Sequence, residues 1–355
     1  MDEKYKGRRQ KRSLFWPMVF IGVGVMALLG NLGVLSRANF VVLLRLWPLA
    51  LIMVGLDILF GRRWPILGAL IGLGTVALAI LLMLIGPSMG WGDDAEIKTD
   101  TFVEEIGAAT SARINLDLSS APTTVSALGD SDDLIDADLT YNGKIRFNVR
   151  GEQEKTVNLS QRSDWSFTWF DWFDDDDKLR WDIALSSRLP LELEIDAGSG
   201  SSTLDLHRLQ LTELKLDVGS GSVRANLPAA ERHYDAQVDG GSGSCTLNLA
   251  DGAAVSLDAD AGSGKITIEI GDQSDVSLRL DGGSGSISIG VPAHAAVRVD
   301  VRDGGSGSVH VLSNMERTRR GDDDKGMWET PGFEDAAYQI EIIVDDLGSG
   351  SITVR

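Results

Sequence analysis

Seven aspartates in the C-terminal half of this 355-residue chain recur in one setting, each followed two residues later by Gly and then by Ser-Gly. They are Asp196, Asp217, Asp239, Asp260, Asp281, Asp303 and Asp346. A row of carboxylates could bind cations, as in calcium-binding glycine-rich rolls, but those need tandem nonapeptides, and the spacing here differs. We therefore expect each Asp side chain to accept hydrogen bonds from the amides of its own corner. A Gly-Ser-Gly that repeats so often marks a corner and not a serine nucleophile.

The spacing of the repeated serines predicts the architecture. Successive serines are 21, 22, 21, 21, 22 and 43 residues apart, so the last interval is two periods and one repeat carries an insertion. A fixed period of this length is typical of a solenoid. Apolar residues alternate after each serine, as in Ile266, Ile268 and Ile270, and a second alternating run precedes it, which indicates two half-buried strands per repeat. The sequence predicts an all-β parallel β-helix with right-handed crossovers.

The remaining β region divides into segments of different regularity. Residues 101–190 show the same apolar alternation less regularly and are predicted to be irregular capping rungs of the β-helix. Residues 88–100 are predicted to be a linker that joins these rungs to the N-terminal region. Residues 191–355 are the regular β-helix. Its insertion, near 313–336, is polar and is predicted to be a surface loop.

An aromatic segment precedes the regular repeats and is the candidate partner-contact site. Its members are Trp165, Phe167, Trp169, Phe170, Trp172 and Phe173. Such a cluster should not face water without a reason. One interpretation is a strand that covers the open end of the solenoid. The other is an exposed loop that docks a partner or enters the bilayer interface, although the acidic run at 174–177 opposes deep membrane contact.

The N-terminal region is predicted to be an α-helical transmembrane region over 14–87. Three apolar stretches, 14–35, 40–60 and 64–86, approach the roughly 20 residues that cross a bilayer. The basic segment 1–13 is predicted to be cytoplasmic, because positive residues favour that side. Three crossings put the β-helix outside the cytoplasmic membrane. If the second stretch is re-entrant, two crossings remain and the β-helix faces the cytoplasm.

Charge and composition exclude some functions. Residues 1–92 hold ten Lys and Arg against three Asp and Glu, and the rest of the chain carries a net charge of −26. Such an acidic domain does not bind nucleic acid, whose affinity depends on neutralised phosphates. The four histidines are scattered without metal-ligand spacing, and Cys245 falls on an inward strand position. We expect no enzyme activity, no cofactor and no metal.

Several short motifs carry a family resemblance. They are the Trp-Pro pairs at Trp16, Trp47 and Trp64, the segment Trp181-Asp-Ile-Ala-Leu, and Pro190-Leu-Glu-Leu-Glu-Ile-Asp-Ala-Gly-Ser-Gly followed by Leu204-Asp-Leu. The chain resembles the LiaF-type cell-wall-active-antibiotic response proteins, and its soluble part resembles the toast-rack, adhesin-like group of bacterial β-helices. The chain has three apolar stretches where such relatives often have four.

The resemblance implies a bacterial membrane protein that responds to envelope stress and contacts other proteins. In LiaF-type proteins the partner is commonly a membrane histidine kinase, which they restrain. The alternative is a membrane-anchored adhesin-like or structural surface module. The two alternatives stay open at the level of the sequence.

Overall fold

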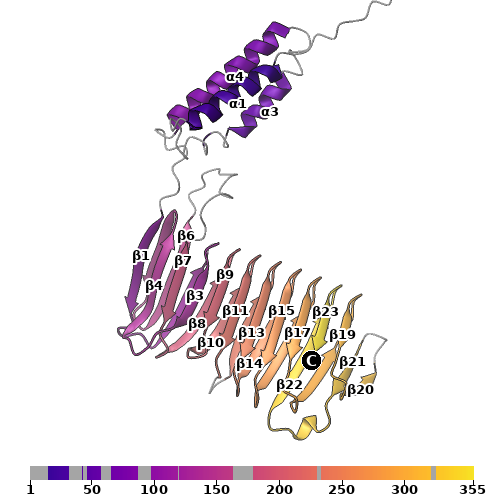
Figure 1. Cartoon of the computed structure of the whole chain (residues 1–355). Helices are drawn as coiled ribbons and strands as arrows, with labels where there is room; N and C mark the ends of the chain where they lie inside the picture. The colour runs from indigo at the N-terminus through magenta and orange to yellow at the C-terminus, as the bar shows by residue number, and fades with distance from the viewer. Residues whose placement is uncertain are drawn as a thin grey trace, which may run out of the picture. The chain divides into compact units, whose positions relative to one another are not determined.

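The computed structural model describes residues 15–31, 42, 46–56, 65–86, 97–118, 120–162, 179–229, 233–320 and 325–355. The chain forms a helical unit within residues 1–96 and a β unit that begins at Ile97 (Figure 1). The aromatic segment 165–173 and the basic segment 1–13 lie outside the described residues.

The helical unit contains α1 (Phe15–Asn31), α3 (Trp47–Leu56) and α4 (Pro65–Ile85). Helix α3 begins at Trp47-Pro48 and α4 is described from Pro65, and proline's missing N–H has no helical partner in a first turn in any case. Helices α1 and α4 approach closely at Gly22, where a Cβ atom would lie 2.6 Å from Val76, and they bury Met26 and Met83.

The described helices lie within the three apolar stretches that were predicted to cross the bilayer. Within the described residues, α1 has 17 residues, α3 has 10 and α4 has 21. Counting only the positions that the structure describes, none of the helices is long and apolar enough to cross a membrane.

The β unit consists of two long sheets that enclose one core. Sheet A, in spatial order, contains β1 (Lys98–Glu105), β4 (Asp133–Tyr141), β7 (Arg180–Leu185), β3 (Thr123–Ala127), β9 (Ser201–Asp205), β11 (Ser222–Leu227), β13 (Ser244–Leu249), β15 (Lys265–Ile270), β17 (Ser286–Gly290), β23 (Ser351–Val354) and β19 (Ser308–His310). Sheet B contains β20 (Glu316–Arg320), β21 (Gly326–Glu329), β18 (Ala296–Val301), β22 (Gln339–Asp346), β16 (Asp275–Asp281), β14 (Ala254–Asp260), β12 (Tyr234–Asp239), β10 (Gln210–Asp217), β8 (Pro190–Asp196), β2 (Ser111–Asp117), β6 (Glu154–Arg162) and β5 (Lys144–Arg150).

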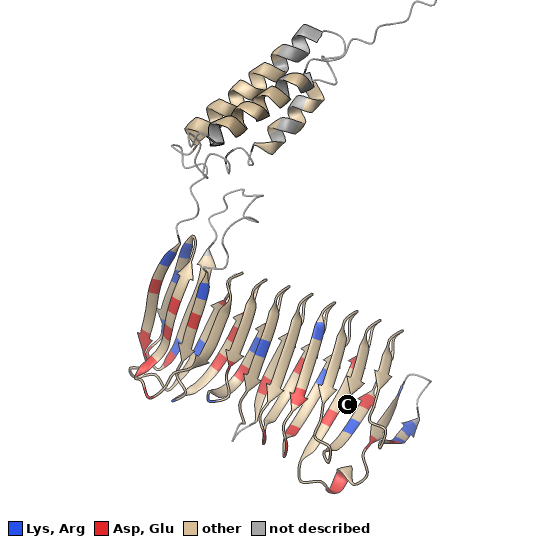
Figure 2. Cartoon of the chain, viewed as in Figure 1, with Lys and Arg blue, Asp and Glu red and all other residues tan. Residues whose placement is uncertain are grey.

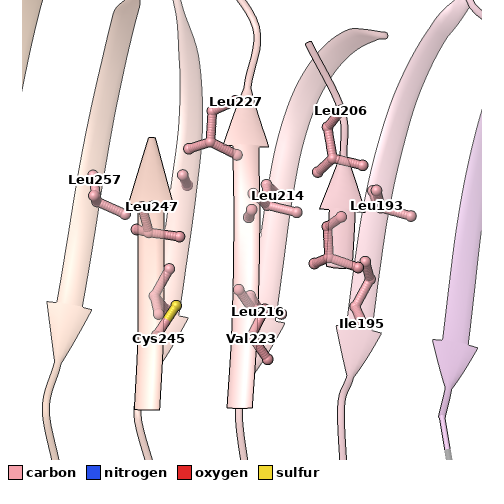
Figure 3. Packing of buried hydrophobic residues seen from close by; sticks show 14 of the residues in the cluster. Leu193, Ile195, Leu206, Leu214, Leu216, Val223, Leu227, Cys245, Leu247 and Leu257 are labelled. Atoms are coloured by element: carbon pink, nitrogen blue, oxygen red, sulfur yellow. The ribbon is translucent and has the colours of Figure 1, made fainter. Parts of the chain in front are cut away.

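Each repeat of the regular region, from β8–β9 to β16–β17, forms one rung of the stack, with one strand in sheet B and the next in sheet A. Neighbouring strands are parallel and in register, so that Leu247, Ile268 and Ile289 form one inward row. All three side chains are fully buried. Leucines from both sheets meet between the sheets in Figure 3. The two-strand, parallel repeat is therefore present as predicted.

The rungs do not stack in sequence order at either end of the β unit. Strands β2 and β3 lie between β6–β7 and β8–β9, and the C-terminal pair β22–β23 lies between β16–β17 and β18–β19. The segment 313–336, predicted to be a surface loop, holds β20, β21 and the 3-10 helix η5 (Phe333–Asp335). This prediction was wrong because β21 pairs antiparallel with the outer edge of β18 and so extends sheet B.

Candidate interaction surface

The repeated aspartates form one continuous row along the corner of the solenoid. Strand pairing sets Asp196 beside Asp217, and the row continues through Asp239, Asp260, Asp281 and Asp346. The Leu347 N–H donates to the Asp303 carbonyl, which places Asp303 at the end of the row. The chain order of the last two members is thus reversed in space.

Each of the seven carboxylates accepts a hydrogen bond within its own corner. Oδ1 receives the N–H of the glycine two residues later, at distances from 2.8 to 3.3 Å. This is the geometry that the turn-capping interpretation requires. At Asp303 the Gly305 amide, with Lys325 nearby, lowers the pKa of the carboxyl below its usual value.

An eighth carboxylate, Asp117, lies in the same row and was missed by sequence reasoning. It pairs with Asp196 at the end of β2. Burial, and then repulsion from Asp196, raises the pKa of the Asp117 carboxyl. The sequence hides it because Ser119-Ser120-Ala121 follows in place of Gly-Ser-Gly. The available signal was the apolar alternation of Ile114 and Leu116, which precede Asp117 in the chain.

Glycine at the corner is required by the close approach of neighbouring rungs. A Cβ atom on Gly264 would lie 2.3 Å from the carbonyl oxygen of Gly243, and one on Gly221 would lie 2.1 Å from that of Gly200. Real Cβ atoms do not approach carbonyl oxygens so closely. The first glycine of each corner, such as Gly262 with φ of 55°, also occupies the left-handed region.

Packing does not explain the repeated serines, which are exposed. Serines of four rungs and the glycines between them line a shallow groove of about 560 Å³. Its residues are Ser263, Gly264, Ser284, Gly285, Ser286, Ser306, Gly307, Ser308, Ser349, Gly350 and Ser351. The groove is uncharged, and the C-terminal rung contributes Ser349, Gly350 and Ser351 to it between the rungs of Ser284 and Ser306.

The outer faces of the two sheets differ in charge. On sheet A the outward positions of β11 and β13 are mostly hydroxyl and amide groups, and the Asn248 amide donates to Asn226 Oδ1 at 2.9 Å. On sheet B three of the four outward positions of β8 are acidic, namely Glu192, Glu194 and Asp196. Figure 2 colours the acidic residues of the β unit red. Sheet B can therefore repel anions, whereas the regular rungs of sheet A offer mainly uncharged hydrogen-bonding groups.

The titratable groups of the described residues form no recognisable catalytic arrangement. His207 contacts Asp205 at 2.6 Å, and His233 contacts Ser256 at 2.6 Å, both on exposed surface. Burial raises the pKa of the Cys245 thiol to about 12, which keeps it protonated and unreactive at neutral pH. No group of three or more potential metal-ligating side chains occurs in the described parts of the chain. The absence of enzyme activity stays a prediction.

The described end of the stack is closed by residues that the sequence analysis did not single out. Phe102 of β1 and Phe147 of β5 meet with ring centroids 5.5 Å apart. They come from different sheets and pack against the core, so they cover its end. The role of the aromatic segment Trp165–Phe173 as cap or contact site stays a prediction.

Comparison with known families defines the class of this protein. Residues 176–354 match the family described as Toastrack DUF4097, residues 91–248 match the N-terminal domain of toast_rack, DUF2154, and residues 14–59 match the LiaI-LiaF-like transmembrane region. The chain belongs to the toastrack family. The LiaI-LiaF-like match covers α1 and α3 and indicates membrane association.

Two solved structures are similar to this chain. One is a "putative cell adhesion protein" from Clostridium sporogenes, with 16% identity, a TM-score of 0.34, and coverage of 73% of this chain and 99% of the other. The second is a "putative adhesin" from Parabacteroides distasonis, with 11% identity, a TM-score of 0.28, and coverage of 74% and 98%. Scores this low carry no argument about function. No curated protein matches.

Proposed function

We propose that this chain is a non-enzymatic protein of the bacterial cell envelope that senses or regulates envelope stress through protein–protein contact. The observation that carries the proposal is the union, in one chain, of a LiaI-LiaF-like transmembrane region with a toastrack solenoid. The described side chains support it, because the repeated Asp and Gly have structural roles and form no catalytic arrangement. The partner class is a membrane histidine kinase or another envelope protein.

We also propose a multi-pass topology with the β-helix outside the cytoplasmic membrane. The six basic residues between Lys4 and Arg12 favour a cytoplasmic N-terminus. Protease added to cells after wall removal should then degrade a C-terminal tag and spare an N-terminal one. Protection of both tags would contradict this topology.

The regulatory role is tested by replacing residues 1–92 with an unrelated membrane anchor of the same topology. A regulator whose helices contact a sensor should lose its effect on the response to a wall-active antibiotic. A matched control keeps the native helices and replaces exposed Thr203 and Arg224 on sheet A with Ala. If only the control variant loses its effect on the antibiotic response, the partner contacts the β unit and not the helices.

An adhesin-like surface module is the second candidate, favoured by the uncharged Ser and Gly groove along the corner. Such a module should keep its activity after the anchor exchange, since only display outside the membrane matters. Attachment of intact cells to a surface, measured with both anchors, separates the two functions.

A further inference from the structure

The C-terminal rung enters the stack between two rungs that precede it in the chain. Strand β22 pairs in parallel with β16 on one side and β18 on the other, and β23 pairs with β17 and β19. The regular rungs from β8 to β17, in contrast, lie beside their sequence neighbours. Residues 339–355 therefore fill a position that lies between consecutive repeats (Figure 1).

The backbone partners on the two sides of this rung are interchangeable. The Ser349 N–H donates to the Gly283 carbonyl at 2.8 Å, and the Ser306 N–H donates to the Gly348 carbonyl at 2.8 Å. If the rung were absent, Ser306 could donate directly to Gly283. That bond would repeat the one from Ser284 to Gly262, which is 2.7 Å long. Direct stacking would leave no corner amide unpaired, so it avoids the cost of a buried unsatisfied donor.

The side chains on the two sides also match. Ile340 lies between Val276 and Val297, and Val344 lies between Leu280 and Val301. All of these side chains are at most 2% exposed. Strand β18 could therefore pair with β16 with the same residues facing inward. The 22-residue spacing from Ser284 to Ser306 is the ordinary spacing of the repeats.

Asp345 connects the inserted rung to both neighbours. A register shift at the end of β16 gives β22 one extra residue, and this residue is Asp345. Its carboxylate accepts from Arg279 Nη1 of β16 at 2.9 Å and from Arg302 Nη1 beside β18 at 2.7 Å. Removing the rung deprives both guanidinium groups of this partner.

The outer edge of β18 is closed to the C-terminal rung. Strand β21 pairs with that edge, and Arg298 holds it through Glu329 at 2.7 Å. The Arg298 guanidinium also lies 4.2 Å from the ring centroid of Phe333 in η5. The gap between β16 and β18 is consequently the position that remains for β22.

We propose that residues 339–355 form a releasable rung, and that β18–β19 closes directly onto β16–β17 when the rung leaves. The two arrangements use the same backbone partners and the same inward residues, so the fold has two stacking orders. Release exposes the apolar alternation of Ile340, Ile342 and Val344, which the stack otherwise buries. The device concerns the β unit alone and does not depend on the proposed stress-sensing role.

The two stacking orders differ in one distance that a disulfide can report. Ser288 and His310 both pair with Thr353, one from each side. With β23 between them, their Cα atoms are two strand spacings apart, about 9.6 Å, which is beyond the roughly 7 Å limit of a disulfide. In the closed arrangement the separation is one spacing, about 4.8 Å. Buried Cys245 does not compete, because its thiol pKa is raised to about 12.

The experiment uses the full chain in membranes with Ser288→Cys and His310→Cys, under mild oxidation. We expect little disulfide in this variant and rapid disulfide formation in the positive control, Ser288→Cys with Thr353→Cys. Adding Asp345→Arg to the Ser288→Cys and His310→Cys variant should raise the crosslinking rate at least about tenfold. The new arginine would lie beside Arg279 and Arg302, and the repulsion of the three positive charges favours release. The matched control is Asp258→Arg, which faces Arg279 from β14 and should leave the rate unchanged.

A chain that ends at residue 336 gives the second readout. With Ser288→Cys and His310→Cys it should crosslink fully while the core strands β8–β17 stay resistant to protease. Loss of that resistance, or an intact core without the disulfide, would overturn the proposal. An unchanged crosslinking rate with Asp345→Arg in the full chain would overturn it as well.

Discussion

The regular rungs and the C-terminal rungs carry the same Asp-x-Gly-Ser-Gly corner, yet they stack in different orders. Between β8 and β17 each rung lies on its predecessor in the chain, whereas β22–β23 lies between β16–β17 and β18–β19. The corner hydrogen bonds are of the same kind in both regions. The comparison teaches that a periodic corner specifies how two rungs meet but not which two rungs meet. Groups outside the corner, such as Asp345 and the β20–β21 hairpin, decide the order.

The largest effect is expected inside the regular rungs. Ile268→Asp should destabilise the β unit by more than about 4 kcal/mol, because it buries an unpaired charge in a fully buried row. Glu269→Gln is the matched control one residue along; it removes only the exposed pair with Arg355 and should cost about 0.2 to 1 kcal/mol. Denaturant unfolding measures both. Equal losses would show that the inward register is wrong.

The next largest effect compares glycines in the two regions. Gly264→Ala should cost about 1 to 3 kcal/mol, because its Cβ would press on the Gly243 carbonyl between two fixed rungs. Gly307→Ala meets the Gly350 carbonyl in the same way, but sheet A ends at this rung, where β19 can move outward. Its loss of stability should be smaller. A larger loss at Gly307 would mean that the end of the stack is as rigid as the middle.

The aspartate row should give a smaller effect. Asp260→Ala should cost about 1 kcal/mol through loss of the bond to the Gly262 amide, and Asp260→Asn should be mild because an amide oxygen still accepts. Calcium and a chelator should leave the Tm unchanged. A calcium-dependent rise in Tm that Asp260→Asn abolishes would identify the row as cation sites instead.

The smallest effects are expected in the pH dependence of stability at Asp117 and Asp303, which lie at the two ends of the aspartate row. The pKa of Asp117 is raised, so its charged form opposes folding, and stability falls as the pH rises through that pKa. The pKa of Asp303 is lowered, so its contribution is present above the unfolded pKa and is lost as the pH falls through the folded value. Asp117→Asn should therefore stabilise the β unit at pH 7 relative to pH 3, and Asp303→Asn should do the opposite. The Tm at both pH values measures the difference, and shifts of the same sign in both variants would contradict these assignments.

Much of the regular region could be predicted from the sequence. Alternation around Ile266, Ile268 and Ile270 identifies strand and inward face together, because side chains of a strand alternate between its faces. The corner that recurs seven times indicates parallel stacking, since equivalent residues of a solenoid must lie side by side. The aspartate row followed from the same period, and Asp117 was missed because its corner lacks the glycines.

The rest could not be predicted, because it depends on contacts between residues far apart in the chain. Arg279 and Asp345 are 66 residues apart, and only the folded chain brings them to 2.9 Å. Segment 313–336 is polar by composition, and its strands form because β21 finds the unpaired edge of β18.

The sequence by itself determined the repeat, the inward residues and the chemistry of each corner, because these depend on a local period and on the conformations open to glycine and aspartate. Tertiary structure alone decided the order of the rungs at both ends and which rungs line the Ser and Gly groove. Rungs with the same pattern offer equivalent backbone partners, so local sequence does not specify which two rungs meet. Long-range groups such as Asp345, Arg298 and the β20–β21 hairpin select one of them.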